Sequence, residues 1–245
     1  MISIIPIDGI PIMETEDDYW QAIDKVAQQL EPMDVLVVAH TPWSRINGPN
    51  YILTDIKPSP RAVELGALLD KDPRHVEVIL KESKAIVKTG RKVIVTENHA
   101  GIVCANGGVD QSNAGLGHLI GVPHHPDQLA TTIRTRIRET YDINVAVIIS
   151  DTVGRALRRG AVNIGIGVAG IAAMRSEKGK QDLFGYTMRV SEVALIDELA
   201  SAAELVQGQT NEANPFVIIR GFDYPSTEDT TASILNRPAN ERIFK

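Results

Sequence analysis

Apolar, β-branched runs alternate along this chain with longer segments whose apolar residues recur every three or four positions. The apolar runs predict buried strands at residues 3–7, 34–39, 93–96, 102–105, 145–150, 163–170, 187–190 and 216–221. The segments with helical spacing predict amphipathic helices at residues 14–30, 60–69, 127–141 and 192–206, and another that begins at Pro73. Thr15 and Ser59 stand at preferred capping positions, and Asp72 precedes a proline that can open a helix.

The stretch at residues 145–170 carries the most chemical information. Its predicted strand leads directly into Asp151 and Thr152, whose oxygens suit a hard divalent cation. Arg155, Arg158 and Arg159 follow closely, and guanidinium groups match phosphate or carboxylate geometry. This combination favours phosphoryl-transfer chemistry at the strand end. A charged surface turn between two strands is the alternative interpretation.

Four further polar loops follow predicted strand or helix ends, at residues 8–13, 40–48, 106–113 and 207–214. None contains Gly-x-x-x-x-Gly-Lys-Ser/Thr, and no Gly-x-Gly-x-x-Gly leads from a strand into a helix. Neither a Walker loop nor a Rossmann fold is therefore expected. Gly165 and Gly167 lie in an apolar run and predict a strand that packs closely against another backbone.

Two groups of basic side chains have simple structural interpretations. His124 and His125 are adjacent in an extended segment, where they point to opposite sides, so we expect a linker rather than a metal site. Arg134, Arg136 and Arg138 are expected on the solvated face of the helix at residues 127–141.

Composition narrows the class of protein. The 245 residues are 43% hydrophobic and 23% charged, which is typical of a globular protein with a sizeable core. A net charge of -6 argues against a general nucleic-acid partner. No apolar run approaches the roughly 20 residues of a membrane span, and no signal peptide is expected. The single cysteine, Cys104, is expected in the core and suits a cytoplasmic location.

Several of these stretches together carry a family resemblance over nearly the whole chain. The segments that carry it are Pro6-Ile7-Asp8-Gly9-Ile10-Pro11, Asn106-Gly107-Gly108-Val109-Asp110-Gln111-Ser112-Asn113, Asp151-Thr152-Val153-Gly154-Arg155 with Arg158 and Gly160, Asp182-Leu183-Phe184-Gly185, and Val217-Ile218-Ile219-Arg220-Gly221. In this order they resemble the coenzyme F-420-0:L-glutamate ligase family, the gamma-glutamyl ligases of deazaflavin biosynthesis.

The resemblance implies an enzyme that joins L-glutamate to coenzyme F-420-0 with GTP and divalent metal, through an acyl phosphate. It implies an α+β fold with mixed or antiparallel sheets, not of the Rossmann type, and an intertwined homodimer. Residues 1–245 would form a single ligase unit with two subdomains, one of about residues 1–90 with 190–245 and the other of about 91–189. No membrane or nucleic-acid partner is implied.

The resemblance also implies functional roles for particular residues. Asp110 and Asp151 would hold one Mg2+ or Mn2+ ion, Thr152 and Gln209 would lie at a second, and K+ is a further candidate ion. Asp151, Arg155 and Arg158 would be catalytic. The nucleotide would be contacted by Gly9, Ile10, Pro11, Ile12, His40, Thr41, Arg45, Asn113, Gln207, Gly208, Gln209, Thr210, Asn211, Glu212 and Ala213.

The chain departs from the family pattern at several of these positions. Arg45 replaces a lysine that contacts nucleotide phosphate in the family, and Asn47 replaces a glutamate. His40 stands where a small hydroxyl residue is common, the loop at residues 207–214 has few glycines, and Arg242 replaces an acidic residue. The acceptor, the number of glutamates added and the choice of GTP or ATP stay open. A ligase with another carboxylate acceptor and a non-catalytic nucleotide- or deazaflavin-binding paralogue are the alternatives.

Overall fold

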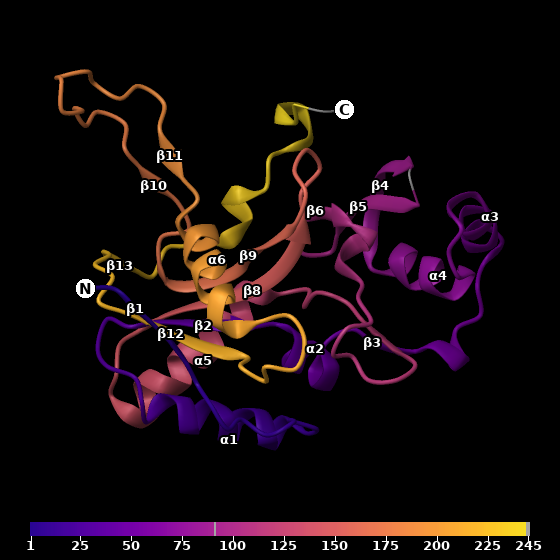
Figure 1. The fold of residues 1–245 in the computed structure, drawn as a ribbon, viewed down its shortest axis with the longest axis horizontal. Coiled ribbons are helices and arrows are strands. Elements are labelled where there is room, and N and C mark those ends of the chain that lie inside the picture. Colours follow the sequence, from indigo (N-terminus) through magenta and orange to yellow (C-terminus); the bar gives the residue numbers. More distant parts are fainter. Residues whose placement is uncertain (91, 244–245) are drawn as a thin grey trace.

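A six-stranded mixed sheet forms the centre of the molecule, as the computed structural model of residues 1–90 and 92–243 shows (Figure 1). Its strands are, in spatial order, β1 (Ser3–Pro6), β12 (Phe216–Arg220), β2 (Val35–Ala39), β8 (Ala146–Gly154), β9 (Ala161–Ile171) and β13 (Ser226–Thr227). The β2–β8 pair is parallel, and the other neighbouring pairs are antiparallel. The predicted α+β fold with mixed and antiparallel sheets is confirmed.

Helices cover both faces of this sheet. Side chains alternate along β2, so that Leu36 and Val38 enter one core while Val35 and Val37 enter the other. The first core takes the apolar faces of α1 (Glu16–Ala27) and α5 (Pro126–Tyr141), and the second takes that of α6 (Leu195–Gln207). The central strands are therefore buried on both sides, which explains their continuous apolar sequence.

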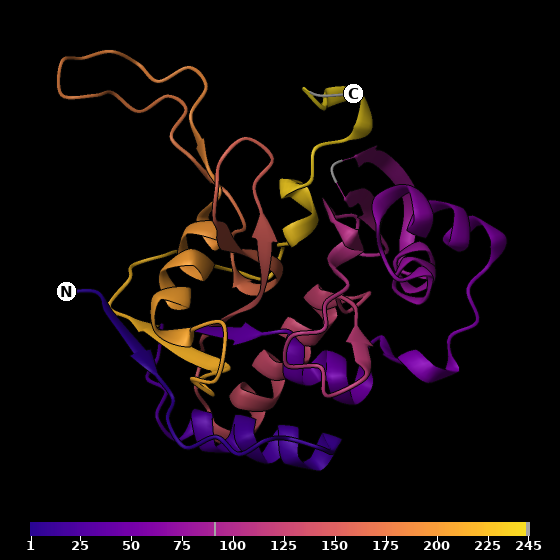
Figure 2. The same ribbon diagram turned by 45° about the vertical axis from the view of Figure 1, so that its right-hand side comes forward.

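A smaller layer lies beside the carboxyl end of β2 (Figure 2). It contains the antiparallel strands β4 (Ser83–Gly90), β5 (Val93–Asn98) and β6 (Val103–Ala105), with α3 (Pro60–Leu69) and α4 (Pro73–Lys81) packed together on a small core of their own. The remaining elements are the pair β3 (Asn50–Ile52) and β7 (His118–Ile120) and the 3-10 turns Leu53–Asp55, Asn106–Gly108, Ala232–Leu235 and Ala239–Glu241.

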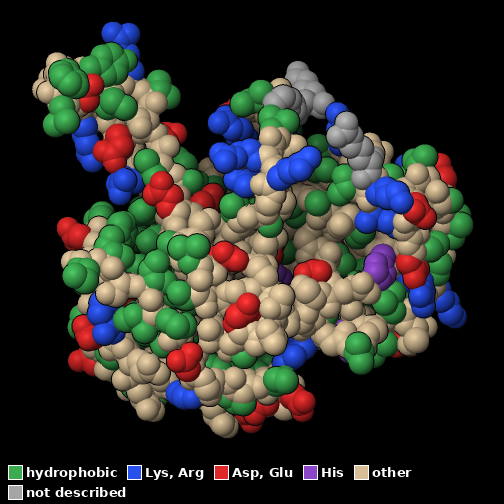
Figure 3. All heavy atoms as spheres, in the orientation of Figure 1, with side chains coloured by type: hydrophobic (Ala, Val, Ile, Leu, Met, Phe, Trp, Pro, Cys, Tyr) green, Lys and Arg blue, Asp and Glu red, His purple; other side chains and the backbone are tan. Residues whose placement is uncertain are grey.

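An extended arm leaves the sheet between residues 175 and 193. Its base is the short pair β10 (Arg175–Ser176) and β11 (Glu192–Val193), and both ribbon views show it projecting away from the body (Figures 1 and 2). Apolar side chains gather toward its end in the space-filling view (Figure 3). The strand predicted at 187–190 is wrong, because these residues form no strand and take part only in an isolated bridge, between Gln181 and Thr187, and in turn hydrogen bonds of Met188.

The capping signals located three helix starts correctly. Thr15 and Asp18 form a reciprocal capping box at α1, Ser59 accepts the backbone N–H of Ala62 at α3, and Asp72 accepts that of Arg74 at α4. Each of these side chains satisfies a backbone donor that the first helical turn leaves free.

Two predicted loops are regular structure. Residues 41–47 form the helix α2 (Thr41–Asn47) instead of a polar loop. Asp151 and Thr152 lie inside β8 rather than beyond its end, because this strand continues to Gly154 in antiparallel pairing with β9.

Arg134 corrects the prediction of a fully solvated helix face. Its side chain is buried, its Nε donates to the carbonyl of Val145, and its guanidinium also binds Asn144 and Glu228. Arg136 instead pairs with Asp24 near the surface. The six-stranded sheet takes strands from both ranges predicted as subdomains, and that division stays a prediction.

Candidate functional site

One cavity of about 730 Å³ opens beside the carboxyl end of β2. Polar segments that are far apart in the sequence meet around it, including the turn after β1, the start of α2, the turn before β7, the outer half of β8 and the loop after α6. The residues predicted as functional that line it are Ile10, Pro11, Ile12, His40, Thr41, Arg45, Asp110, Asn113, Asp151, Thr152, Gln207, Gly208, Gln209, Thr210, Asn211, Glu212 and Ala213.

Three predicted residues are not part of this lining: Gly9, Arg155 and Arg158. Arg155 donates to the carbonyls of Arg159 at 2.7 Å and Gly160 at 3.2 Å, so its guanidinium closes the β8–β9 turn. Gly9 has a φ of +68°, and its carbonyl accepts from Lys25 at 2.7 Å, which fixes the turn whose next residues reach the cavity. The roles predicted for these residues stay predictions.

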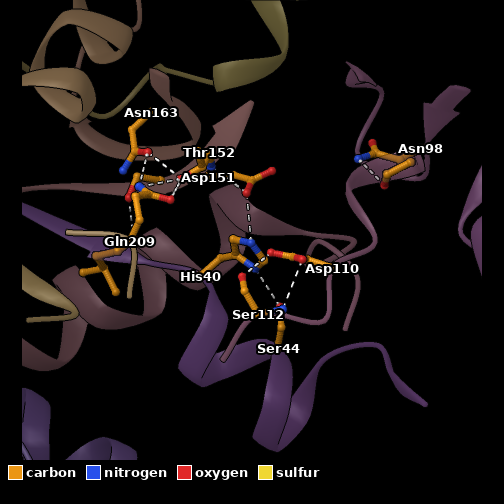
Figure 4. A network of polar contacts seen from close by, with 12 residues as sticks. His40, Ser44, Asn98, Asp110, Ser112, Asp151, Thr152, Asn163 and Gln209 are labelled. Carbon is orange, nitrogen blue, oxygen red and sulfur yellow. Dashed lines mark hydrogen bonds and ion pairs between the residues drawn. The ribbon is translucent and has the colours of Figure 1, made fainter. Parts of the chain in front are cut away.

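Asp151 is held by the pairing of two parallel strands. Ala39 is opposite Ser150 in the register, so the next residues, His40 and Asp151, are neighbours across the strands. The Nε2 atom of His40 lies 3.1 Å from Oδ1 of Asp151, and its Nδ1 atom lies 2.9 Å from Oγ of Ser44 (Figure 4). The backbone N–H of Thr152 donates to the same Asp151 oxygen at 2.7 Å.

Asp110 is oriented by its own turn. Its Oδ1 accepts the backbone N–H groups of Gln111 at 2.6 Å and Ser112 at 3.1 Å, and its Oδ2 accepts the Ser112 hydroxyl (Figure 4). These three donors come from the turn itself and orient the carboxylate. The cavity thus contains two carboxylates that reach it from different parts of the fold.

A network of amide and hydroxyl side chains lies beside Asp151, and Gln209 also donates from it to the Glu204 carboxylate at 3.1 Å. Oγ1 of Thr152 is 2.6 Å from Oδ1 of Asn163 and within 3.2 Å of the Gln209 amide (Figure 4). Asn163 also donates to the buried Gln207, whose oxygen lies 3.5 Å from the Ser150 hydroxyl. This network joins the outer part of the β8–β9 hairpin to the loop after α6.

Arg45 lies in α2 and lines the cavity, where its guanidinium donates to the backbone carbonyl of Met13. It therefore fastens the turn after β1 to α2. The bond occupies one donor of a group that has five, so the other donors remain for a ligand.

Several cavity residues were not predicted from the sequence. Ser112 lies inside the predicted polar loop at residues 106–113, whereas Asn163 is recognisable only from its pairing with Thr152 across the β8–β9 hairpin. Cys104 packs against the core, as predicted, but it also lines the cavity. Burial, with a smaller effect from the nearby Asp151 carboxylate, raises the pKa of its thiol to about 12, so it is not a nucleophile at neutral pH.

The donor set fits a hard divalent cation. The two aspartates, Thr152 and Gln209 offer only oxygen ligands of the kind that Mg2+ and Mn2+ take. Among residues 1–90 and 92–243, no cluster of three or more His, Cys, Asp or Glu side chains has metal-binding geometry. A site of one or two carboxylates is nevertheless usual for Mg2+, which shares its coordination with substrate phosphates and water.

The comparison with protein families agrees with the geometry of the cavity. The sequence profile described as F420-0:Gamma-glutamyl ligase matches residues 9–221, which include the whole of this lining. The chain belongs to this ligase family. The family resemblance noted in the sequence is confirmed.

Curated relatives match almost end to end. A Coenzyme F420:L-glutamate ligase of Methanopyrus kandleri is 47% identical over 224 residues, which cover 90% of this chain and 88% of the relative. The protein of the same name from Methanocaldococcus jannaschii is 45% identical, over 88% of this chain and 86% of the relative. That from Methanothermobacter thermautotrophicus is 39% identical, over 100% of this chain and 99% of the relative. In the described part of this family member, no helix has the length and apolar character needed to cross a bilayer.

Proposed function

We propose that this protein is a GTP- and metal-dependent ligase that adds L-glutamate to coenzyme F-420-0. One observation supports this above all. The carboxylates of Asp110 and Asp151 line the same cavity as the turn after β1 and the loop after α6, two of the segments expected to contact nucleotide. The curated relatives are named as F420:L-glutamate ligases, which supports the same acceptor and the same amino acid here.

The reaction must activate a carboxylate, which is a poor electrophile. In the proposed sequence, the terminal carboxylate of F-420-0 attacks the γ-phosphorus of GTP, forming an acyl phosphate and releasing GDP. The amine of glutamate then attacks the acyl carbon, a C–N bond forms, and inorganic phosphate leaves with the C–O electron pair. The amine gives up its proton as the amide forms.

The chain's own residues would serve this reaction by holding charged groups together. Asp110 and Asp151 would bind one Mg2+ or Mn2+ ion, and Thr152 and Gln209 would lie at a second; K+ is a further candidate. When bound, such ions offset the negative charge that gathers between phosphates and acceptor. Arg45 would contact a nucleotide phosphate from α2, and the hairpin arginines Arg155 and Arg158 would favour anionic substrates near the cavity.

Incubation with F-420-0, L-glutamate, GTP and Mn2+, followed by mass spectrometry, tests the proposal. A product heavier by one or more glutamyl units, formed together with GDP, is expected. Asp151→Asn is the matched control, since it removes one ionised ligand while conserving side-chain size. Absence of any adduct with wild-type protein under these conditions would contradict the assignment of the acceptor.

A second candidate is a ligase of the same mechanism with another carboxylate acceptor. It is favoured by the departures from the family pattern at His40, Arg45 and Asn47, which lie on and next to α2. Such an enzyme would release GDP only when its own acceptor is supplied. A non-catalytic paralogue would bind nucleotide or deazaflavin without turnover. The retention of both aspartates, Asp110 and Asp151, argues against this alternative.

We also propose that the protein is a homodimer in the cytoplasm. The arm between residues 175 and 193 supports the dimer, because its apolar end has no covering structure among the described residues of its own chain. The need for nucleotide and the free thiol of Cys104 support the proposed cytoplasmic location.

A further inference from the structure

His40 is the most deeply buried ionisable side chain at the cavity. It is 5% exposed and occupies the position just before α2, yet its ring makes no capping bond to that helix. The ring instead extends toward β8. Its backbone N–H donates to the carbonyl of Ser150 at 3.1 Å and so continues the β2–β8 pairing. The sheet therefore fixes where this imidazole lies.

The ring contacts leave Asp151 with one engaged and one free oxygen. Because an ionised carboxylate can only accept, Nε2 of His40 carries a hydrogen and donates to Oδ1 of Asp151. Oδ1 also accepts from the backbone of Thr152. Within the described residues, no protein donor hydrogen-bonds to Oδ2.

We propose that His40 is a positioning residue that holds the Asp151 carboxylate so that Oδ2 remains available to a divalent cation. The inference rests on the proposed function, in which Asp151 binds that cation, and it gives His40 a task other than the expected contact with nucleotide. Hydrogen bonds from outer groups commonly orient carboxylate ligands, and their loss typically weakens metal binding about 10- to 100-fold.

Ser44, His40 and Asp151 are linked in series and are the residue types of a hydrolase triad. Unlike the serine of such a triad, however, Ser44 is not accessible to a substrate. Ser44 is 0% exposed and lies within α2, so its hydroxyl cannot meet a substrate. Its Oγ lies beside Nδ1 of His40, where it holds the ring in place. The three residues thus form a support for Asp151, with Ser44 at the far end.

Two substitutions separate the two ring contacts. His40→Gln places an amide N–H near the position of Nε2 and can still donate to Asp151. The shorter side chain of His40→Asn reaches only as far as the position of Nδ1 and cannot donate to Asp151. Ser44→Ala is the matched control, because it leaves the His40–Asp151 contact in place and removes the more distant one.

The measurement is the binding of Mn2+ to nucleotide-free and GDP-loaded protein, followed by the electron paramagnetic resonance signal of free Mn2+. His40→Asn should weaken Mn2+ binding by about tenfold or more, His40→Gln should restore most of it, and Ser44→Ala should have a smaller effect than His40→Asn. Thermal unfolding checks that each variant is folded. GDP binding in EDTA should be the same in all four proteins, since the metal is then absent.

Three results would overturn the proposed role of His40 alone. If His40→Asn bound Mn2+ as tightly as the wild-type protein, Asp151 would not need His40 to hold its carboxylate. Equal losses in the Asn and Gln variants, together with lowered melting temperatures, would assign a packing role. Weaker GDP binding in EDTA would assign His40 to the nucleotide instead. A wild-type protein that binds no Mn2+ in either state would refute the proposed function itself, and the role of His40 with it, whereas the other three results leave that function standing.

Discussion

Asp110 and Asp151 reach the same cavity by different means. Asp151 is part of a central strand, where backbone pairing and His40 fix it, whereas Asp110 is held by hydrogen bonds within its own turn. A rigid strand places one anionic group and a local turn places the other. Neither carboxylate has a Lys or Arg ion-pair partner among the described residues, so their charge remains for a ligand.

Asp110→Asn and Asp151→Asn should each abolish glutamate ligation and leave the fold intact. Each change removes a hard anionic oxygen while keeping the size of the side chain. Steady-state release of GDP at limiting Mn2+ measures the loss, and circular dichroism checks the fold. Normal turnover in either variant would contradict the metal assignment.

Arg45→Ala should weaken GTP binding about ten- to a hundredfold, because hydrogen bonds to charged groups contribute roughly 1.5–3 kcal/mol. Arg45→Lys should be tolerated, since lysine binds phosphate as a point charge. Calorimetric titration with GTP, GDP and guanosine measures both variants.

Guanosine is the control for the bond between Arg45 and the Met13 carbonyl. If Arg45 acts only by fastening that turn, guanosine affinity falls as much as GTP affinity. A loss confined to the phosphorylated ligands is the expected result.

Sequence could identify half of the residues that line the cavity, but not their partners. Asp151 and Asp110 stand out because each is a carboxylate in a polar stretch that follows an apolar run of the sequence. The contact between His40 and Asp151 joins residues 111 positions apart, and it exists only because β2 and β8 pair in one particular register. No local pattern encodes that register, since the paired residues 35–38 and 146–149 are all apolar.

At the scale of elements, β9 has two glycines whose neighbours leave no room for a side chain. An added Cβ at Gly167 would lie 2.4 Å from the backbone C and O atoms of Pro126, where α5 begins. The expected close approach of backbones is confirmed there. An added Cβ at Gly165 would instead lie 2.7 Å from the side chain of Ile196.

Gly167→Ala should therefore lower the free energy of unfolding by about 1–3 kcal/mol, the usual cost of overpacking a core. The backbone of α5 cannot yield as the end of a flexible side chain can. Gly154→Ala in the same hairpin is the control, because no atom of the described residues lies within 4 Å of its added Cβ. Urea unfolding measures both variants, and equal stabilities would refute the tight contact.

The cap of α4 should make stability depend on pH. Hydrogen bonds from Arg74 lower the pKa of Asp72 to about 2 from its ordinary 3.8. A depressed pKa stabilises the fold above pH 3.8, and that contribution is lost as the pH falls toward 2. Asp72→Asn keeps a capping oxygen and removes the charge.

Wild-type protein should be more stable than this variant at pH 7, by at most about 1 kcal/mol because the pair is partly exposed. The difference should shrink between pH 4 and pH 2. Urea titrations at pH 7, 5 and 3 measure it. A difference that is constant over this range would contradict the assignment to the Asp72 charge.

Long amphipathic or apolar segments were predicted well, and short ones were not. The helix α2 has seven residues, a proline near its start and no side-chain cap, so its sequence is typical of a loop. It forms because it packs beside α1 and the cavity, through contacts such as that between Trp43 and Tyr19. Tertiary packing, rather than local preference, decides such short elements.

At the scale of the whole molecule, the arm between residues 175 and 193 projects away from the rest of its own chain (Figure 1). Leu183 and Phe184 are 98% and 96% exposed at its end. Exposing apolar side chains to water is unfavourable by roughly 25 cal/mol of free energy per Å². A second copy of the chain that covers the arm would remove that cost.

The protein should therefore sediment at about twice its chain mass of 26.7 kDa at micromolar concentration. Changing Leu183 and Phe184 together to Asp should yield a monomer, because two charges would have to be buried in the interface. Leu68→Asp on α3, another exposed leucine far from the arm, is the control and should leave the dimer intact. Unchanged thermal unfolding of the monomer's core would show that the arm serves assembly rather than folding. Wild-type protein that sediments as a single chain would refute the dimer, and a monomer produced by Leu68→Asp alone would move the interface to α3.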